Sequence, residues 1–375
     1  MTKQLLILDL WHNKRGGASK SALYGELSKL FDLEFVPAPD FSFSEFTNLV
    51  KSLHFDISKW RKRKSHLDEV MFKYPRMFRA VTRHYNEQLR RVGGVYDAIL
   101  QIGSLFGPVD NLRGVPYFSY SDSTVRNPDL MWKPWMPSDF DRYRDEWYAL
   151  EKNCFQHLTG SMFYSQWAAN TLVTEYGIDL AKTHVVGSAL KIPDEYAVDW
   201  SFRGKQVLFV TTSFELKGGY ELIDIFAQVV TQVSDVVLRI IGNVPESIQK
   251  LNYPWLKLMG PLSRLEVIEA YKQASLLVLP AKYDAFPSVI LEAANFEIPS
   301  VASNICGIPG MIIDGQTGFL AEKGNAAQFA EKIIVLLKDR EMSIRMGKAA
   351  KQFVRERFHP KVVAGRIKDV IEKFI

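Results

Sequence analysis

Two acidic residues stand eight positions apart in the stretch AKYDAFPSVILEAANFEIPSVAS, residues 281 to 303. Asp284 precedes a predicted helix, and Glu292 lies in the middle of that helix among Val, Ile, Leu, Ala and Phe. A carboxylate removed from water needs hydrogen-bond donors, because its burial without them costs several kcal/mol. The two hydroxyls of a ribose are donors with suitable spacing for Glu292, and an internal salt bridge is the alternative.

The start of the same helix has the chemistry of an anion site. Pro287 suits a first helical turn because its missing N–H would be unpaired there, and its neighbours Phe286, Ser288 and Val289 still offer amides. These amides and the positive end of the helix dipole attract negative charge. We therefore expect a phosphate group at residues 286–289.

Lys217 forms a second candidate anion site, in the stretch TTSFELKGGYELIDIF at residues 211–226. A cation at a helix N-terminus opposes the helix dipole by about 0.3 to 1 kcal/mol, so this arrangement favours an anion that binds both. Gly218 lets the backbone approach a ligand closely. An exposed lysine before a Gly-Gly turn is the alternative. Together, the two sites predict a diphosphate between Lys217 and the Pro287 helix start, with its ribose on Glu292.

Two further segments follow these residues, EIPSVAS at 297–303 and DGQTGFL at 314–320. In this order, Lys217-Gly218, the Asp284 to Glu292 spacing and the two segments resemble the nucleotide-binding domain of family 4 glycosyltransferases. These are retaining enzymes of the GT-B fold that use nucleotide-diphosphate sugars. The resemblance covers residues 205–358 and implies that this half of the chain binds a UDP- or GDP-sugar.

The resemblance also implies a role for each matching residue. Lys217 would bind the diphosphate, Asp284 would face the hydroxyls of the donor sugar, and Glu292 would bind the ribose. The other implied donor contacts are Thr212, Ser213, Gly218, Asn243, Met259, Gly260, Phe286, Pro287, Ser288 and Val289, with the nucleobase near Asn243 and Met259-Gly260.

Two of these positions depart from the family pattern. Asp284 stands where relatives usually have glutamate, and it is one methylene shorter. We expect it to set which sugar is accepted. Thr212 stands where many members have an arginine, so Lys217 would act with fewer cationic partners, although Ser213 could donate a hydrogen bond.

The first half resembles the acceptor domain of the same family through Gly16 and Gly17, VPYFSYSDST at 115–124 and YSQW at 164–167. Gly16 and Gly17 would let a helix start approach the transferred sugar and its phosphate. Asp122 stands where many members have a histidine, which implies that it accepts a hydrogen bond from a substrate hydroxyl. A loop cap on nearby backbone amides is the alternative for Asp122. No residue is assigned as a catalytic base.

The elements that must position these residues alternate between short apolar runs and stretches of helical period, which is typical of parallel α/β sheets. We predict strands at 4–10, 96–103, 115–120, 160–165, 205–213, 235–242, 255–260 and 275–280, and helices at 16–31, 66–89, 140–158, 218–230, 263–274, 288–297, 326–339, 340–358 and 360–375. The expected fold is α/β, of GT-B type, with two Rossmann-like domains facing a cleft. The expected segments are an acceptor domain at 1–190, a nucleotide-sugar domain at 191–360, and a helix at 361–375 that crosses back to the first domain.

We predict neither a metal nor another cofactor. Asp139 and Asp141 have the D-x-D spacing of metal-using transferases, but they are better explained as the capped start of a following helix. Trp132 and Trp135, in MWKPWMP, could stack on sugar rings, and packing of a long loop is the alternative.

The positive charge of the chain is concentrated in residues 59–91, which contain eleven Lys and Arg but only three Asp and Glu. This run reads either as a solvated helix face or as a contact for an anionic membrane surface. Nucleic acid is not expected as a partner, because no recognised nucleic-acid module accompanies the run.

No apolar run is long enough to span a membrane, no signal peptide is evident, and Cys154 and Cys306 suggest neither a disulfide framework nor a zinc site. The expected location is the cytoplasm, with peripheral attachment to the inner face of the membrane as an option.

The expected function is transfer of a sugar from a nucleotide-diphosphate sugar to a hydroxyl of a glycan or lipid-linked acceptor, in polysaccharide or glycoconjugate biosynthesis. One alternative is a GT-B sugar-nucleotide epimerase. Another is a non-catalytic relative that binds the nucleotide sugar without turnover, which the absent arginine and histidine favour.

Overall fold

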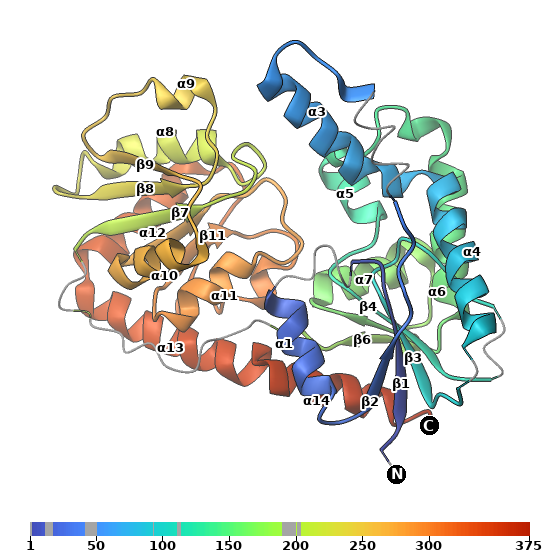
Figure 1. Cartoon of the computed structure of the whole chain (residues 1–375). Coiled ribbons are helices and arrows are strands. Elements are labelled where there is room, and N and C mark those ends of the chain that lie inside the picture. Colours follow the sequence, from blue (N-terminus) through green and yellow to red (C-terminus); the bar gives the residue numbers. More distant parts are fainter. Residues whose placement is uncertain are drawn as a thin grey trace. The chain divides into compact units, whose positions relative to one another are not determined.

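The computed structural model describes residues 2–11, 18–41, 51–92, 94–110, 114–189, 200 and 204–375. Gly16 and Gly17 therefore lie outside the described residues. The chain divides into two compact units, which we call unit 1, Met1–Ser188 with Val363–Ile375, and unit 2, Ala189–Val362 (Figure 1). Among the described helices, none combines the length and the apolar character needed to cross a membrane.

The described part of unit 1 is built around a six-stranded parallel sheet with the strand order β2-β1-β3-β4-β5-β6. Its strands are β1 (Gln4–Asp9), β2 (Asp32–Phe35), β3 (Ala98–Ile102), β4 (Tyr117–Ser121), β5 (Gly160–Phe163) and β6 (Thr183–Val185). Its helices are α1 (Ala18–Leu27), α3 (Ile57–Val70), α4 (Pro75–Arg91), α5 (Arg126–Met131), α6 (Arg144–His157), α7 (Gln166–Tyr176) and most of α14 (Pro360–Ile371). Every residue of β3, β4 and β5 is buried, as expected for parallel strands covered by helices on both faces.

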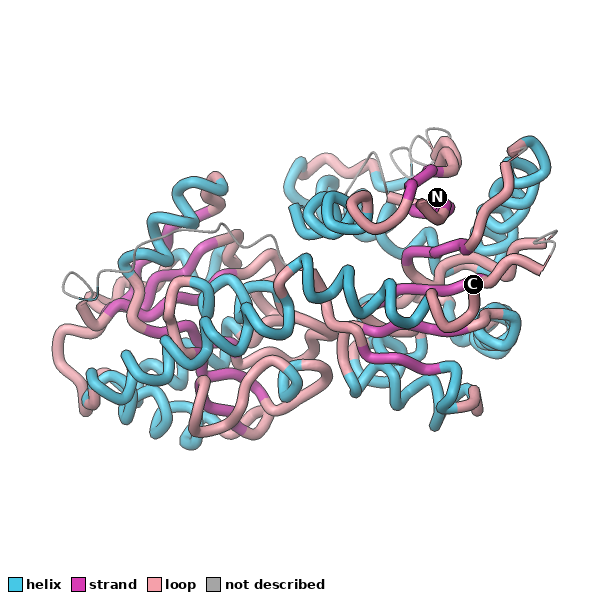
Figure 2. Tube along the Cα trace, turned by 90° about the horizontal axis from the view of Figure 1, so that it is seen from below, coloured by secondary structure: helices cyan, strands magenta, loops and turns pink. Residues whose placement is uncertain are grey.

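Unit 2 has a second six-stranded parallel sheet, ordered β12-β11-β10-β7-β8-β9. Its strands are β7 (Gln206–Val210), β8 (Val237–Ile241), β9 (Leu256–Gly260), β10 (Leu276–Leu279), β11 (Ser300–Ser303) and β12 (Gly318–Ala321). Its helices are α8 (Gly219–Val229), α9 (Glu246–Gln249), α10 (Arg264–Gln273), α11 (Ser288–Asn295), α12 (Ala326–Lys338) and α13 (Arg340–Phe358). Within this unit α8 packs on α12 and α11 packs on α13, and helices surround the strands when the unit is seen from below (Figure 2).

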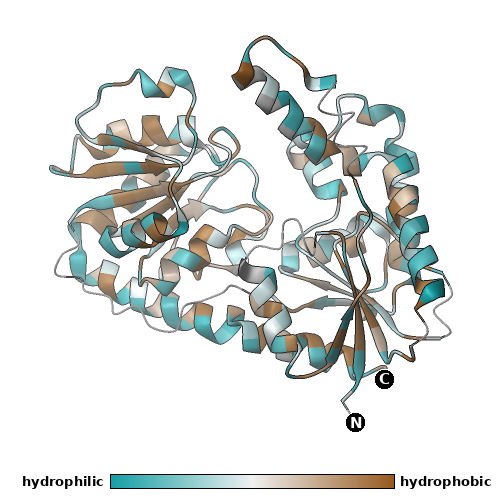
Figure 3. Ribbon diagram, in the orientation of Figure 1, coloured by the Kyte–Doolittle hydropathy of each residue, from teal (hydrophilic) through white to brown (hydrophobic). Residues whose placement is uncertain are grey.

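Each unit has its own hydrophobic core. The core of unit 1 joins apolar side chains of its strands and helices, including Leu6, Ile99 and Phe163, and that of unit 2 includes Leu208 and Val278. Figure 3 shows hydrophobic residues along the strands and hydrophilic residues along the outer parts of helices such as α13. Because each unit has its own core, each sheet is rigid, and the loops that follow its strands are held in place at the sheet edge.

The chain returns to unit 1 through its last helix, α14. From the end of this helix, the ring of Phe374 contacts that of Phe118 on β4, with 5.7 Å between the ring centroids. Arg366 donates a hydrogen bond to the Val186 carbonyl at 3.4 Å. The C-terminal residues therefore belong to the fold of unit 1, although they follow unit 2 in the sequence.

The structure confirms the predicted strands of both sheets but divides the helix predicted at 66–89. Helix α3 ends at Val70, a 3₁₀ turn covers Met71–Lys73, and α4 begins at Pro75. Proline cannot supply a backbone N–H and disfavours helical geometry in the residue before it, and Tyr74 is extended with φ −93° and ψ 135°. The prediction of one continuous helix was therefore wrong because it ignored this proline.

The predicted capping role of Asp139 was also wrong. Residues Phe140–Arg142 form a 3₁₀ turn, α6 begins at Arg144, and the Asp139 side chain makes no capping hydrogen bond. Its Oδ1 instead accepts from the hydroxyl of Tyr74 at 3.1 Å, while Asp141 pairs with Arg144. Both acids are used in local contacts.

Candidate functional site

A cavity of about 490 Å³ opens in unit 2 at the carboxyl ends of β7, β8 and β10. From β7 the chain adds β8 and β9 on one side of the sheet, and it then adds β10, β11 and β12 on the other side. Parallel α/β sheets characteristically bind ligands at the point where the direction of strand addition changes, which here lies between β7 and β10. We call this cavity the unit 2 pocket. Its lining residues are Val210, Thr211, Thr212, Lys217, Ile241, Gly242, Asn243, Pro261, Leu262, Val267, Leu279, Asp284, Phe286, Pro287, Ser288 and Val289.

Two glycines allow the loops of this pocket to approach the strand ends. Gly218 caps α8 with φ 78°, and a Cβ there would lie 1.9 Å from the Pro280 carbonyl oxygen. Gly242 has φ 121°, and a Cβ there would lie 1.8 Å from the Thr211 carbonyl oxygen. Neither position can hold a larger residue without displacing the backbone. Gly218 thus lets the Lys217 loop pack on Pro280, directly after β10. It is not among the residues that line the pocket, and its predicted contact with a ligand stays a prediction.

Lys217 and Asp284 meet inside the unit 2 pocket. Lys217 Nζ donates to Asp284 Oδ2 at 2.5 Å, and the side chains are only 18% and 13% exposed. The chain thereby brings together a cation and a carboxylate that lie 67 positions apart in the sequence. In this low-exposure setting the pair offers a positive group for phosphate and an acceptor for hydroxyl groups.

The start of α11 supplies further donors, although not all those predicted. Pro287 is the residue before the helix rather than its first residue, and α11 begins at Ser288. The Phe286 amide donates to Asp284 Oδ1 at 3.2 Å, so it serves to hold Asp284 in place. Ser288 and Val289 line the pocket at the positive end of the helix dipole. Asp284 is therefore fixed from two directions, by Lys217 and by the backbone that leads into α11.

Glu292 lies one turn farther along α11 and is not among the residues that line the cavity. Arg264 Nη1 donates to its Oε1 at 3.0 Å, and the Tyr271 hydroxyl donates to its Oε2 at 3.1 Å. Burial and the neighbouring carboxylate raise the pKa of Tyr271 well above its usual value, which keeps its hydroxyl protonated. The salt bridge considered as an alternative is thus present, and the ribose contact of Glu292 stays a prediction.

The remaining predicted residues of unit 2 divide into two groups. Thr212 and Asn243 line the pocket, whereas Ser213, Met259 and Gly260 do not. Sequence reasoning missed Pro261, Leu262 and Val267, which line it from the loop after β9 and from α10. The segment SRLE at 263–266 was a usable signal, since Ser263 and Glu266 form a capping box that fixes the start of α10.

Unit 1 has a comparable cavity, of about 350 Å³, at the carboxyl ends of β1, β3 and β4. We call it the unit 1 pocket. Its lining residues are Leu10, Trp11, Lys20, Phe72, Lys73, Ile102, Gly103, Ser104, Leu105, Tyr120, Ser121, Asp122, Ser123, Thr124, Val125, Pro128, Trp135 and Tyr164. The predicted residue Asp122 is exposed in this pocket and accepts a hydrogen bond from Ser123 Oγ at 3.3 Å. Trp135 also lines it, whereas Trp132 does not.

Charged side chains lie in the wall of the unit 1 pocket or directly behind it. Asp9, at the end of β1, is 1% exposed and accepts from Lys20 Nζ at 3.0 Å and from the Tyr24 hydroxyl at 2.7 Å. Burial, together with the Asp9 carboxylate, raises the pKa of Tyr24. Lys73 Nζ donates to the Trp135 carbonyl and lies 5.1 Å from the centroid of the Trp135 ring. The pocket therefore combines aromatic faces with polar groups.

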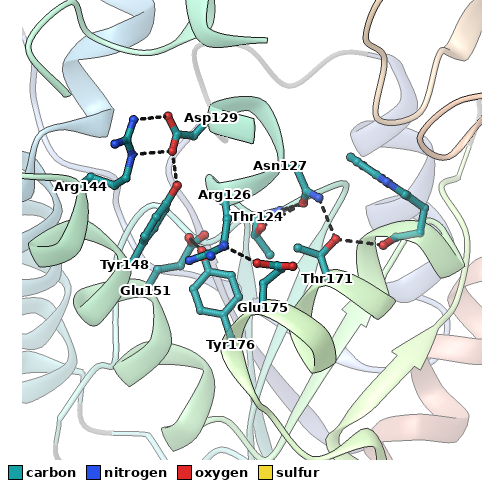
Figure 4. Close-up of polar contacts among 11 residues, drawn as sticks. Thr124, Arg126, Asn127, Asp129, Arg144, Tyr148, Glu151, Thr171, Glu175 and Tyr176 are labelled. Atoms are coloured by element: carbon teal, nitrogen blue, oxygen red, sulfur yellow. Dashed lines mark hydrogen bonds and ion pairs between the residues drawn. The ribbon is translucent and has the colours of Figure 1, made fainter. Parts of the chain in front are cut away.

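A polar network that includes Thr124, Asn127, Glu151 and Tyr176 lies next to the loops of the unit 1 pocket (Figure 4). Glu151 on α6 is fully buried and accepts from Ser104 Oγ at 2.6 Å, from the Val125 amide at 3.0 Å and from the Tyr176 hydroxyl. Asn127 Oδ1 accepts from the Thr124 amide at 3.0 Å. Ser104, Thr124 and Val125 all line the pocket, so the network ties the loops after β3 and β4 to α6 and α7.

The acidic, histidine and cysteine side chains of the described ranges do not gather into a metal centre. No group of three or more His, Cys, Asp or Glu in these residues could hold a metal ion. The metal-free, cofactor-free chemistry expected from the sequence stays a prediction.

Part of the chain is similar to a known protein family. Residues 199–353 match the family described as Glycosyl transferases group 1. The capsular polysaccharide biosynthesis glycosyltransferase CapM of Staphylococcus aureus is 28% identical over 167 residues, which cover 42% of this chain and 43% of CapM. The N-acetyl-alpha-D-glucosaminyl L-malate synthase of Bacillus anthracis is 27% identical over 187 residues, 48% of each chain. The matched segments span less than half the length of these curated relatives.

Solved structures extend the likeness to the whole chain at the level of fold. Sucrose-phosphate synthase of Thermosynechococcus elongatus superposes with a TM-score of 0.67 at 14% identity, covering 99% of this chain and 98% of the other. Anabaena Alr3699/HepE, solved with UDP-glucose, gives a TM-score of 0.62 at 15% identity and 99% coverage of both chains. The predicted GT-B fold class, with two Rossmann-like parallel-sheet domains, is confirmed.

Proposed function

We propose that the protein is a glycosyltransferase that moves a sugar from a UDP- or GDP-linked donor to a hydroxyl of a glycan or lipid-linked acceptor. Retention of anomeric configuration is part of the proposal, and it rests on the resemblance of the Lys217 and Asp284 to Glu292 motifs to family 4. A role in polysaccharide or glycoconjugate biosynthesis agrees with the function of CapM, one of its relatives.

The observation that carries the proposal is the ion pair of Lys217 and Asp284 within the unit 2 pocket. Its nitrogen and oxygen atoms lie 2.5 Å apart beside the start of α11 and at the strand ends where parallel α/β sheets bind ligands. A diphosphate needs a cation and backbone amides, and a sugar needs a hydroxyl acceptor. This pocket has all of these groups within one cavity.

The catalytic contribution of the unit 2 pocket would be electrostatic. When the bond from the sugar to the diphosphate breaks, negative charge grows on the departing phosphate oxygen. Lys217 and the amides at the start of α11 are preorganised donors for that charge, and such donors commonly supply the largest catalytic term. Lys217 can neutralise phosphate charge without a metal, which fits a metal-independent reaction.

The unit 1 pocket is our candidate for the acceptor site. Trp11, Phe72 and Trp135 offer aromatic faces of the kind that stack on sugar rings, and Asp122 offers an acceptor for a sugar hydroxyl. Asp122 is therefore kept as a substrate contact in this proposal.

A thermal-shift screen with UDP, GDP and ADP, with their nucleosides and with their sugars tests the donor assignment, because a ligand that binds only the folded state stabilises it by mass action. We expect stabilisation by one nucleoside diphosphate in preference to its nucleoside. The absence of stabilisation by every nucleotide in the panel would contradict the proposal.

The two alternatives differ in their products. An epimerase would return a nucleotide sugar with altered stereochemistry, and a non-catalytic relative would bind the donor without releasing nucleotide. A transferase releases the nucleoside diphosphate and joins the sugar to the acceptor. Mass spectrometry and NMR of the reaction mixture therefore separate all three.

Peripheral membrane attachment is a further part of the proposal. Leu53, Phe55 and Ile57 are exposed apolar residues, with Phe55 fully exposed, and they lead into the basic segment 59–91. Apolar side chains beside basic residues favour the surface of an anionic bilayer. We expect the protein to bind vesicles that contain anionic lipid, and we expect this binding to weaken at high salt. Phe55→Asp should also weaken the binding. Leu180→Asp, which changes another exposed apolar residue of unit 1, is the control and should leave the binding unchanged. Equal binding to neutral vesicles would contradict it.

A further inference from the structure

Four of the residues that line the unit 1 pocket carry a hydroxyl group on a short side chain. Each of these hydroxyl groups donates its proton to a carboxylate, carbonyl or amide oxygen of the protein, at distances between 2.6 and 3.3 Å. They can still accept hydrogen bonds from a ligand, but their protons are already in use. The four residues are Ser104, Ser121, Ser123 and Thr124.

Lys20 supplies hydrogen-bond donors that remain available in the same pocket. Its ammonium group has three N–H donors, and one of them binds Asp9 Oδ1 at 3.0 Å. Within the described ranges of the chain, no other side chain or carbonyl accepts a hydrogen bond from this ammonium group. The Lys20 side chain is 24% exposed and lines the pocket, so a ligand can accept from the two remaining donors.

Asp9 fixes the position of Lys20 from behind the pocket wall. The Asp9 carboxylate also accepts from the Trp11 amide at 3.0 Å and from the Tyr24 hydroxyl at 2.7 Å. Burial and the nearby carboxylate raise the pKa of Tyr24, which keeps its hydroxyl protonated. Lys20 itself lies in the first turn of α1, where a cation opposes the helix dipole. An anion bound by Lys20 would offset this unfavourable interaction.

The wall of the pocket carries charges of both signs. Lys73 brings a second ammonium group, which donates to the Trp135 carbonyl and lies 5.1 Å from the centroid of the Trp135 ring. Among the described lining residues, Asp122 is the single acidic one. A ligand that uses all these groups needs negatively charged oxygen atoms for the ammonium groups and hydroxyl donors for Asp122. Sugars that carry a carboxylate or a phosphate group meet both requirements.

We propose that the acceptor bound in the unit 1 pocket is an acidic sugar, and that Lys20 binds its carboxylate or phosphate group. This inference rests on the proposed function, because it takes this pocket to be the acceptor site. A hydrogen bond from an ammonium group is stronger when its acceptor is also ionised. Lys20 should therefore select acidic sugars over neutral sugars of the same shape, with Asp9 and Tyr24 as its positioning residues.

The competing interpretation is that the pair of Lys20 and Asp9 only holds α1 against β1. The two interpretations differ in one measurable quantity, the ratio of the affinity for an acidic sugar to the affinity for its neutral counterpart. A purely structural pair can be replaced by a neutral hydrogen-bonding pair without changing this ratio. Replacement of a pair that binds the acidic group lowers the ratio.

The test measures dissociation constants by calorimetry for methyl hexosides, for the corresponding uronic acids and for the corresponding 6-phosphates. The gluco, galacto and manno series are compared, and the nucleoside diphosphate that stabilises the protein is present to occupy the unit 2 pocket. In the series that binds best, we expect an acidic sugar to bind about 10-fold more tightly than its neutral counterpart, as for a gained charge-assisted hydrogen bond. The tighter of the two acidic sugars identifies the anionic group as carboxylate or phosphate.

The variants separate binding from folding. Lys20→Ala alone would leave Asp9 buried without its cation, which destabilises the fold. Asp9→Asn combined with Lys20→Gln instead removes both charges and keeps hydrogen-bonding side chains at both positions. In this double variant the ratio of acidic to neutral affinity should fall to about 1 to 2. Lys20→Arg keeps the charge and should keep most of the wild-type ratio.

Lys29→Ala is the matched control, since Lys29 pairs with Glu26 near the end of α1 and does not line the pocket. Its ratio should equal that of the wild type. A wild-type ratio close to one, an unchanged ratio in the double variant, or an equal loss in Lys29→Ala would overturn the inference while the proposed function stands. Failure of every nucleoside diphosphate to bind would instead contradict the proposed function, and the sugar ratios measured without nucleotide would still decide the role of Lys20.

Discussion

Lys217 Nζ lies 2.5 Å from Asp284 Oδ2, although the two residues come from loops after different strands, β7 and β10. Both side chains are largely buried, and the Phe286 amide holds the other oxygen of Asp284 at 3.2 Å. In this ion pair each side chain neutralises the charge of the other. A bound diphosphate would compete with Asp284 for Lys217 and would release Asp284 toward the sugar, so substitutions at the two positions should act in opposite directions.

Removing the cation should weaken the binding of phosphate in particular. For Lys217→Ala, we expect the affinity for nucleoside diphosphate to fall about 10-fold or more, the usual cost of losing a charge-assisted hydrogen bond. The affinity for the nucleoside should change little, because the nucleoside lacks the phosphates. Calorimetry with both ligands checks this, and Lys282→Ala, which removes a nearby lysine that pairs with Glu221, is the control. An equal loss for nucleoside and diphosphate would contradict the assignment.

Removing the carboxylate should separate binding from turnover. Asp284→Asn no longer holds Lys217 by charge, so the nucleoside diphosphate should bind at least as tightly as in the wild type. Hydrolysis or transfer of the donor sugar should nevertheless fall, because the hydroxyl acceptor of the sugar is weakened. Parallel measurements of diphosphate affinity and of donor turnover test this. A variant that turns over the donor at the wild-type rate would show that Asp284 does not contact the sugar.

The close approach at Gly218 makes a prediction about stability. Gly218→Ala should destabilise unit 2 by more than the roughly 1 to 2 kcal/mol that positive φ costs an L-residue, because its Cβ would lie 1.9 Å from the Pro280 oxygen. Gly315→Ala is the matched control, since Gly315 has φ 75° and a Cβ there would meet no described atom within 4 Å. Denaturant midpoints of the two variants measure the difference. Equal destabilisation would mean that the Lys217 loop moves easily away from β10.

Glu151 should give unit 1 a characteristic dependence of stability on pH. Burial raises the pKa of this carboxyl group above its usual value, although hydrogen bonds from Ser104, Tyr176 and Val125 oppose the shift. The folded state therefore holds a proton at pH values where the unfolded state has released it. Stability should fall as the pH rises from about 4.5, the unfolded value, through the folded pKa.

Glu151→Gln cannot titrate and should lack this slope. The free energy of unfolding of the wild type minus that of the variant should fall as the pH rises from about 4.5 through the folded pKa of Glu151. This slope is expected whichever protein is more stable at a single pH. Urea midpoints of both proteins across the pH range measure the effect. Parallel curves for the two proteins would show that Glu151 does not have a raised pKa.

The sequence predicted the strands well because buried parallel strands are continuous apolar runs, such as QVLFV in β7 and LLVL in β10. It missed β2, β6, β11 and β12, which are three or four residues long and too short to show a period. It also missed the break before Pro75, because the helical pattern on both sides was allowed to outweigh the rule for proline.

Side-chain partners were harder to predict than elements. The positions of Lys217, Asp284 and Glu292 stood out because charges in apolar or glycine-rich settings need a reason. The pairing of Lys217 with Asp284 depends on how two loops distant in sequence meet at the sheet edge. The pairing of Glu292 with Arg264 depends in the same way on how helices α10 and α11 pack. The use of the Phe286 amide by Asp284 likewise follows from the path of the loop, which local sequence does not specify.

The most direct test of the proposed glycosyltransferase activity is release of nucleoside diphosphate from UDP- and GDP-sugars, measured with and without octyl glycosides as hydroxyl acceptors. We predict release from one donor class, with the sugar recovered on the acceptor or in water, and loss of release in Lys217→Ala. Recovery of an epimerised donor, or release at the same rate in the wild type and in Lys217→Ala, would contradict the assignment of sugar transfer to the unit 2 pocket.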